Sequence, residues 1–239
     1  MKKNILIIIA ALGIQSFAQI DVKMTENVPM ANSNEIIDIT GPSALGGGDE
    51  VIWFEDFGDD TTPNIVTEDI AGYGDWHWSN ESPGGQWSEN AGVIQSETAD
   101  NGFMIMEADF YNTAPQNDVL EGSVGENPVN ANFTIGPIDL SMAETEELVL
   151  QFYSNYRICC YYSPSASNDL NVYISTDGGE TFQDLNYIEG ETFEVNVEKE
   201  VLSQIQLGNF SANTDNVYFR FEWIGTHYFW MIDDLSVIT

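Results

Sequence analysis

Basic residues are scarce in this sequence. Six lysines and arginines stand against 39 aspartates and glutamates, which gives a formal net charge of −33. A surface of that sign repels phosphate, so it excludes nucleic acids and anionic membrane surfaces as partners. The same carboxylates attract divalent cations and favour solubility. The charge balance therefore predicts cation binding rather than nucleic-acid binding.

Cysteine is also rare: the chain has two, Cys159 and Cys160, and they are adjacent. Adjacent cysteines cannot cross-link distant parts of a fold, and they do not have the spacing of a zinc motif. Two alternatives remain open. One is a strained disulfide between neighbours, which an exported location would permit. The other is a pair of free thiols within a strand.

No apolar run is long enough to cross a bilayer. Residues 1–18 instead have the pattern of an export signal, with a basic start, a short apolar stretch and small residues at Ser16 and Ala18. We expect cleavage between Ala18 and Gln19, with an uncleaved anchor as the alternative. The predicted location is therefore secreted or at the cell surface, without membrane insertion after cleavage.

Residues 19–49 are polar, poorly periodic and end in a glycine-rich stretch, which predicts a leader or linker. The remaining segment, 50–239, predicts a single domain of short strands separated by turns. Apolar and polar residues alternate in 148–152, 170–174 and 217–223. Period two predicts half-buried strands. Many such strands without helical spacing predict an all-β fold, a two-sheet antiparallel jelly-roll sandwich of the concanavalin or galactose-binding type.

The closing segment contains two adjacent acids in an apolar run. Trp230 and Ile232 share one parity while Leu235 and Val237 share the other, so one extra residue lies at Asp233-Asp234. This break in alternation predicts a β-bulge, which redirects side chains. Adjacent acids in an apolar strand are unfavourable unless they are neutralised, and only four lysines and arginines remain after signal cleavage.

A bound cation is the predicted neutralising partner. If the first and last strands are neighbours, one structural Ca²⁺ is shared by carboxylates from both ends of the domain. The alternative is a set of solvated acids at strand ends. The candidate ligands are Glu55, Asp56, Asp100, Asp233 and Asp234.

Aromatic residues gather between 73 and 87, among glycines and polar residues. Trp76, Trp78 and Trp87 are the candidate ligand-binding residues, because aromatic rings on a loop stack on sugars or on a partner protein. The alternative is that they cap the sandwich core. Glu107 and Asp109 resemble the paired acids of a glycoside hydrolase on one strand face, although Asn112 stands where a third acid would be expected.

An ordered set of short motifs resembles the MAM domain and the related cleaved-adhesin domain of bacterial surface proteases. The motifs are Phe54-Glu55-Asp56-Phe57, Gly85-Gln86-Trp87, Gly102-Phe103-Met104-Ile105-Met106-Glu107-Ala108, Ile135-Gly136-Pro137-Ile138-Asp139-Leu140-Ser141, Leu148-Val149-Leu150-Gln151-Phe152, Asn171-Val172-Tyr173-Ile174-Ser175 and Trp230-Met231-Ile232-Asp233-Asp234-Leu235. The chain lacks the spaced cysteines of MAM domains, so it is more similar to the bacterial branch.

The resemblance implies a jelly-roll with a structural calcium ion near the opening Phe-Glu and closing Asp-Asp strands. Those motifs match at Glu55, Asp56, Asp233 and Asp234, and more loosely at Asp100. It also implies a non-catalytic adhesion module. The sequence therefore predicts a secreted, calcium-stabilised, carbohydrate-binding or protein-binding module that is not an enzyme. The alternatives are a jelly-roll glycoside hydrolase and an accessory domain of a larger secreted protease.

Overall fold

The structure of this chain is a computed structural model. It describes residues 50–58, 64–88, 90–113, 127–141, 143, 147–159, 168–187, 194–207 and 214–239. The expected signal peptide (1–18) and leader (19–49) lie outside these residues, as does Cys160. Cys159 is described and is disulfide-bonded.

Alternation of apolar and polar residues produces the strands. In β10 (Val217–Gly225) every second side chain is buried and the others are half-buried. The same rule places Asn171 and Tyr173 on the outer side of β7 (Asp169–Ser175). Side chains of a strand point alternately to its two faces, so each strand offers one apolar face to a core. The predicted strands in these segments are confirmed.

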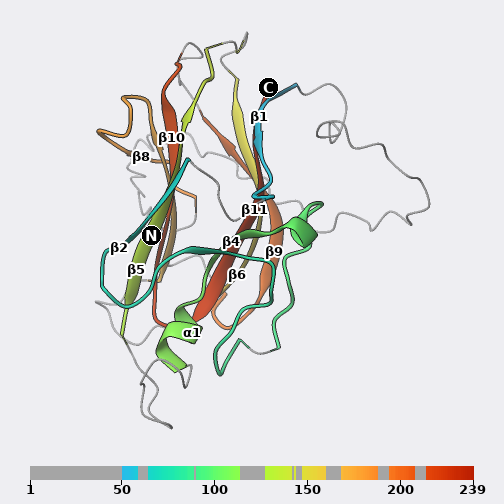
Figure 1. Ribbon diagram of the computed structural model, residues 1–239, viewed down its shortest axis with the longest axis vertical. Helices are drawn as coiled ribbons and strands as arrows, with labels where there is room; N and C mark the ends of the chain where they lie inside the picture. Colours follow the sequence, from blue (N-terminus) through green and yellow to red (C-terminus); the bar gives the residue numbers. More distant parts are fainter. Residues whose placement is uncertain are drawn as a thin grey trace, which may run out of the picture.

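Two antiparallel sheets form a sandwich, which confirms the predicted all-β jelly-roll class (Figure 1). The first sheet contains β1 (Val51–Glu55), β3 (His77–Ser79), β4 (Phe103–Met106), β6 (Val149–Ile158), β9 (Lys199–Gln206) and β11 (Tyr228–Ile238). The second contains β2 (Ile65–Asp69), β5 (Val129–Ile138), β7, β8 (Gln183–Asp184) and β10. Two short helices, η1 (Ala99–Asn101) and α1 (Ala108–Thr113), flank β4.

The main core lies between the sheets and is rich in aromatic rings. Phe133 and Phe221 stack with centroids 4.8 Å apart, and Trp230 packs edge-on against Phe221 at 6.0 Å. All three side chains are fully buried. Burying one such side chain contributes about 1.5–3 kcal/mol, so these rings hold the two sheets together.

A second, smaller core covers the outer face of the first sheet. Ala91 and Ile94 pack there with Phe103, Phe229 and Met231. Met231 and Phe229 belong to β11, whereas Trp230 and Ile232 from the same strand enter the main core. The segment before η1 therefore lies over β11 and buries residues that would otherwise face solvent.

The two ends of the domain meet in the first sheet. β1 pairs antiparallel with β11, from Val51 opposite Ile238 to Glu55 opposite Leu235. Thr239 N also donates to Glu50 O at 3.1 Å. In Figure 1, β1 runs beside β11 near the C-terminus. The condition under which acids from both ends share one site is thus met. Within the described ranges, the helices are too short to cross a membrane.

Candidate functional site

Two aspartates interrupt β11 where its partner strand changes. On one edge, β4 pairs with residues 230–232 and β1 with residues 235–238, so Asp233 and Asp234 lie between the two partners. On the other edge, the register against β6 shifts between Asp233 and Ser236, and Asp234 has a φ of 49°. The predicted β-bulge is confirmed. It directs both carboxylates to residues 96–98, which form hydrogen bonds with them.

A loop covers these two carboxylates and supplies neutral donors. Ser96 Oγ donates to Asp233 Oδ2, and Thr98 Oγ1 donates to Asp234 Oδ1 at 2.6 Å. The backbone N–H of Glu97 donates to Asp234 Oδ2 at 3.0 Å. The exposed fractions are 0% for Asp233 and 7% for Asp234. Neutral donors orient a carboxylate but leave its charge in place, and no ion pair involves either aspartate in the described part of the chain.

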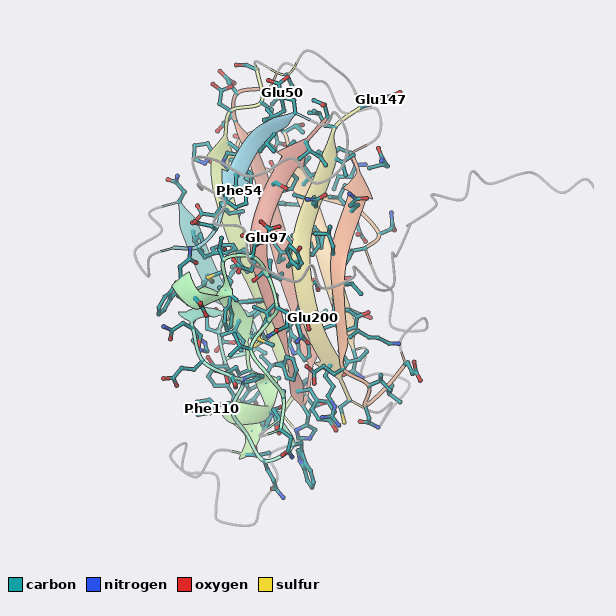
Figure 2. All side chains as sticks on the ribbon, turned by 90° about the vertical axis from the view of Figure 1, so that its right-hand side faces the viewer. Glu50, Phe54, Glu97, Phe110, Glu147 and Glu200 are labelled. Atoms are coloured by element: carbon teal, nitrogen blue, oxygen red, sulfur yellow. The ribbon has the colours of Figure 1, made fainter. Side chains whose placement is uncertain are left out.

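Burial without a cationic partner disfavours the charged forms. Burial, followed by the charge of Asp234, raises the pKa of Asp233 to about 8, and Asp56 adds a smaller effect. Burial also raises the pKa of Asp234, with a contribution from Asp56. The pKa of Glu97 is raised by burial and by Asp234. Glu97 lies on the outer face of the first sheet (Figure 2), so the negative potential extends to the surface.

The predicted ligands from the first strand lie beside the pair. Glu55 is opposite Leu235, and its Oε1 accepts from Phe57 N at 2.9 Å. Asp56 accepts from Gly58 N at 3.0 Å and from Asn101 Nδ2 at 3.2 Å. Asp56 is therefore held between the end of β1 and η1, close enough to both aspartates to raise their pKa values.

Asp100, the loosest of the predicted ligands, occupies η1 with an exposed side chain. Its neighbour Asn101 contacts Asp56 instead. The Oδ1 atom of Asn101 is buried and has no hydrogen-bond partner among the described residues. Asn101, which contacts Asp56 and has a buried Oδ1, is therefore a better candidate ligand than the exposed Asp100.

The side chains around the bulge offer oxygen donors, which is the ligand type that a hard cation binds. Within the described ranges, no three or more His, Cys, Asp or Glu side chains form a ready-made metal cluster. The candidate oxygen donors are the carboxylates of Asp233 and Asp234 at the bulge, the carboxylate of Asp56, and the orphaned Oδ1 of Asn101, whose Nδ2 donates to Asp56. Calcium accepts carboxylate, amide and water oxygens in flexible geometry. The donor set is all oxygen, which suits calcium rather than zinc.

Sequence reasoning missed three residues around this site: Ser96, Thr98 and Asn101. Each donates to one of the carboxylates or supplies the orphaned amide oxygen. They belong to a segment without regular alternation, in which hydroxyl and amide residues are ordinary loop composition. No pattern along the chain separates them from other polar loop residues.

The three predicted ligand-binding tryptophans have different environments. Trp76 is only 2% exposed, its Nε1 donates to Ala131 O at 3.1 Å, and its ring lies 4.9 Å from that of Phe133. The prediction that Trp76 binds a ligand is therefore wrong, because the ring belongs to the core. Trp78 is half-buried and donates from Nε1 to Phe57 O at 2.8 Å, which supports the turn after Asp56.

Trp87 differs from the other two, because its side chain is 46% exposed. Its backbone N–H donates to Asp109 Oδ2 at 2.7 Å, and Asp109 is fully buried. Gly84 N donates to Glu107 Oε1, and His77 Nε2 lies 3.0 Å from Glu107 Oε2. Two carboxylates beneath the loop thus fix the backbone that presents Trp87.

The hydrolase alternative placed Glu107 and Asp109 on one strand face. That placement is wrong: β4 ends at Met106, and Asp109 lies in the first turn of α1. Both carboxylates accept hydrogen bonds from the backbone of the loop that carries Trp87: Gly84 N donates to Glu107 and Trp87 N to Asp109. Asn112, in place of the third acid, donates to Ala108 O and Thr226 O. These contacts make the acids structural supports of the loop.

No protein family and no curated protein matches the sequence. Solved structures with a similar fold include the K3 cleaved adhesin domain of Lys-gingipain from Porphyromonas gingivalis, at 18% identity and a TM-score of 0.44, covering 80% of this chain and 99% of that one. TmCBM61 in complex with β-1,4-galactotriose has 8% identity and a TM-score of 0.39, with 76% and 92% coverage.

A third similar structure is the CBM22-1 xylan-binding domain from Paenibacillus barcinonensis Xyn10C. It has 10% identity and a TM-score of 0.34, and the alignment covers 81% of this chain and 96% of that one. The set contains an adhesin domain and carbohydrate-binding modules, and the likeness is one of fold. The MAM part of the resemblance is not confirmed by them.

Proposed function

We propose that this chain is a secreted, calcium-stabilised, non-catalytic module that binds a glycan or a protein outside the cell. The exposed ring of Trp87 on an anchored loop carries the binding part of the proposal. A tryptophan whose backbone is fixed by a hydrogen bond to buried Asp109 loses little backbone freedom on binding, and its flat indole suits a sugar ring. Of the two ligand classes, this favours a glycan.

Calcium supplies the structural part of the proposal. Asp233, Asp234 and Asp56 are carboxyl groups from the two ends of the domain, and the hydrogen-bond donors shown around them are neutral. Asn101 Oδ1 adds an oxygen without a partner. An ion at this position would bind oxygen donors from the residue after β1, from η1 and from β11, and so fasten the first strand to the last. The signal-like residues 1–18 support export, into surroundings rich in calcium.

The binding test compares wild type with Trp87→Ala in native gels that contain xylan, β-1,4-galactan or lichenan. We expect at least one neutral polysaccharide to retard the wild type, and Trp87→Ala to bind about tenfold more weakly, which corresponds to ~1.4 kcal/mol. Equal melting temperatures establish that the variant is folded. If all three gels leave the wild type unretarded, the glycan proposal fails.

A further inference from the structure

The outer face of the second sheet carries two straight rows of side chains. Strand register places the members of each row on successive strands, four strands for the first row and five for the second. The first row contains Glu68, Asn132, Glu222 and Asn171, and the second contains Val66, Thr134, Arg220, Tyr173 and Asp184. Strands are about 4.8 Å apart, so a row across five strands spans about 19 Å.

The first row is organised around a carboxylate on the central strand. Glu222 Oε2 accepts from Asn171 Nδ2 and from the hydroxyl of Tyr173, both at 2.9 Å. At the other end of the row, Asn132 Nδ2 donates to Glu68 Oε2 at 3.4 Å. Carboxylate acceptors and amide donors therefore alternate along the row, in side chains that hold one another in place.

The second row is organised around a cation. Arg220 Nε donates to Thr134 Oγ1 at 3.0 Å, and its guanidinium carbon lies 3.7 Å from the centroid of the Phe182 ring. The contact with the ring holds the planar guanidinium in one orientation. Tyr173 lies beside Arg220 in the same row and is half-buried. The second row thus places the planar guanidinium of Arg220 beside the aromatic ring of Tyr173.

The two outer faces of the sandwich differ in what covers them. On the first sheet, residues around Ala91 and Ile94 build a second core over β11. On the second sheet, Val66 is 67% exposed, and Arg220, Tyr173 and Glu222 are all partly accessible, whereas Asn132 is only 2% exposed and serves as an internal link to Glu68. In Figure 1 the second sheet is the layer with β2, β5, β8 and β10, on the left.

We propose that this outer face binds a neutral, unbranched polysaccharide along the two rows, as a glycan contact separate from Trp87. Sugar hydroxyls both donate and accept, so they match the accessible amide of Asn171 and the accessible carboxylates of Glu68 and Glu222, and rings such as Tyr173 stack on sugars. The net charge of −33 repels polyanionic glycans, which leaves neutral chains. The inference rests on the proposed glycan-binding function.

The test uses the same gels with xylan, β-1,4-galactan and lichenan, and polygalacturonate as the anionic probe. Tyr173→Ala removes the ring, and Glu222→Gln removes the charge while keeping the shape, which guards against misfolding of the first variant. Gln204→Ala is the control, because Gln204 bonds to Gln151 at 2.8 Å on the outer face of the other sheet. Melting temperatures verify folding.

We expect at least tenfold weaker retardation for both row variants, wild-type retardation for Gln204→Ala and none by polygalacturonate. If Trp87→Ala loses binding while both row variants bind as wild type, this inference is overturned and the proposed function stands. If no neutral polysaccharide retards the wild type, the proposed function falls and this inference falls with it. Retardation by polygalacturonate alone also overturns the inference.

Discussion

Replacing Asp233 by asparagine should raise the stability of the calcium-free protein and weaken its stabilisation by calcium. In the ion-free protein, burial raises the pKa of Asp233 from 3.8 to about 8. Between these values the folded chain holds a proton that the unfolded chain has released. The contribution of Asp233 to stability is therefore fully present below about pH 4, and it is lost as the pH rises toward 8. The side-chain amide of the Asp233→Asn variant does not titrate, so the variant lacks this decrease.

The magnitude follows from the size of the shift. A raised pKa of about 4 units corresponds to as much as ~6 kcal/mol at pH 8, at 1.36 kcal/mol for each unit. Without calcium, Asp233→Asn should therefore be more stable than wild type at pH 8 by several kcal/mol, or on the order of 10 °C in Tm. With calcium at a hundred times its Kd, wild type gains about 2.7 kcal/mol and the variant gains less.

Thermal melting at pH 5 and pH 8, with chelator and with calcium, measures both effects. Asp177→Asn is the matched control, because Asp177 is a fully exposed turn residue whose pKa is lowered to about 2 by bonds from Thr181 and Ser175. It should leave the calcium response unchanged. A wild-type Tm that is equal at both pH values in chelator would refute the buried-charge reasoning. An identical response of wild type and Asp233→Asn to calcium would refute the ion.

Two further substitutions test the loops that support the sites. Gly85→Ala should destabilise the protein by about 1–3 kcal/mol in urea unfolding, because Gly85 has a φ of 100° and a Cβ would lie 2.6 Å from Asp109; Gly92→Ala, which meets nothing within 4 Å, should be neutral. Thr98→Val should lower the free energy of unfolding by ~1–3 kcal/mol at pH 7, since Asp234 loses its 2.6 Å donor. Unchanged urea midpoints would contradict both expectations.

The fold was predictable because local patterns and packing agree. The alternation in 217–223 is satisfied only by a strand with one buried face, and the structure places every second residue of β10 in the core. The break at Asp233-Asp234 predicted a bulge because even-numbered Trp230 and odd-numbered Leu235 can lie on the same face of one strand only if an extra residue is inserted between them. The pairing of β1 with β11 was a condition of the calcium prediction, and the strand register fulfils it.

The parts that sequence reasoning missed depend on tertiary contacts. Periodicity cannot separate a short strand from a short helix, so Asp109 was assigned to a strand although it begins a turn of α1. Trp76 has the same sequence surroundings as an exposed loop aromatic, and only packing against Phe133 and Trp230 places it in the core. Ser96 and Thr98 reach β11 across 137 and 136 residues of sequence, a distance that no local pattern spans.

Calorimetric titration of the chelated chain with CaCl₂ at pH 7.5 tests the central claim most directly. The account predicts one ion per chain, release of a proton on binding because folded Asp233, with a pKa of about 8, holds one at this pH, and loss of the heat signal in Asp234→Asn. Absence of any binding heat, together with a Tm that calcium does not change, would contradict it.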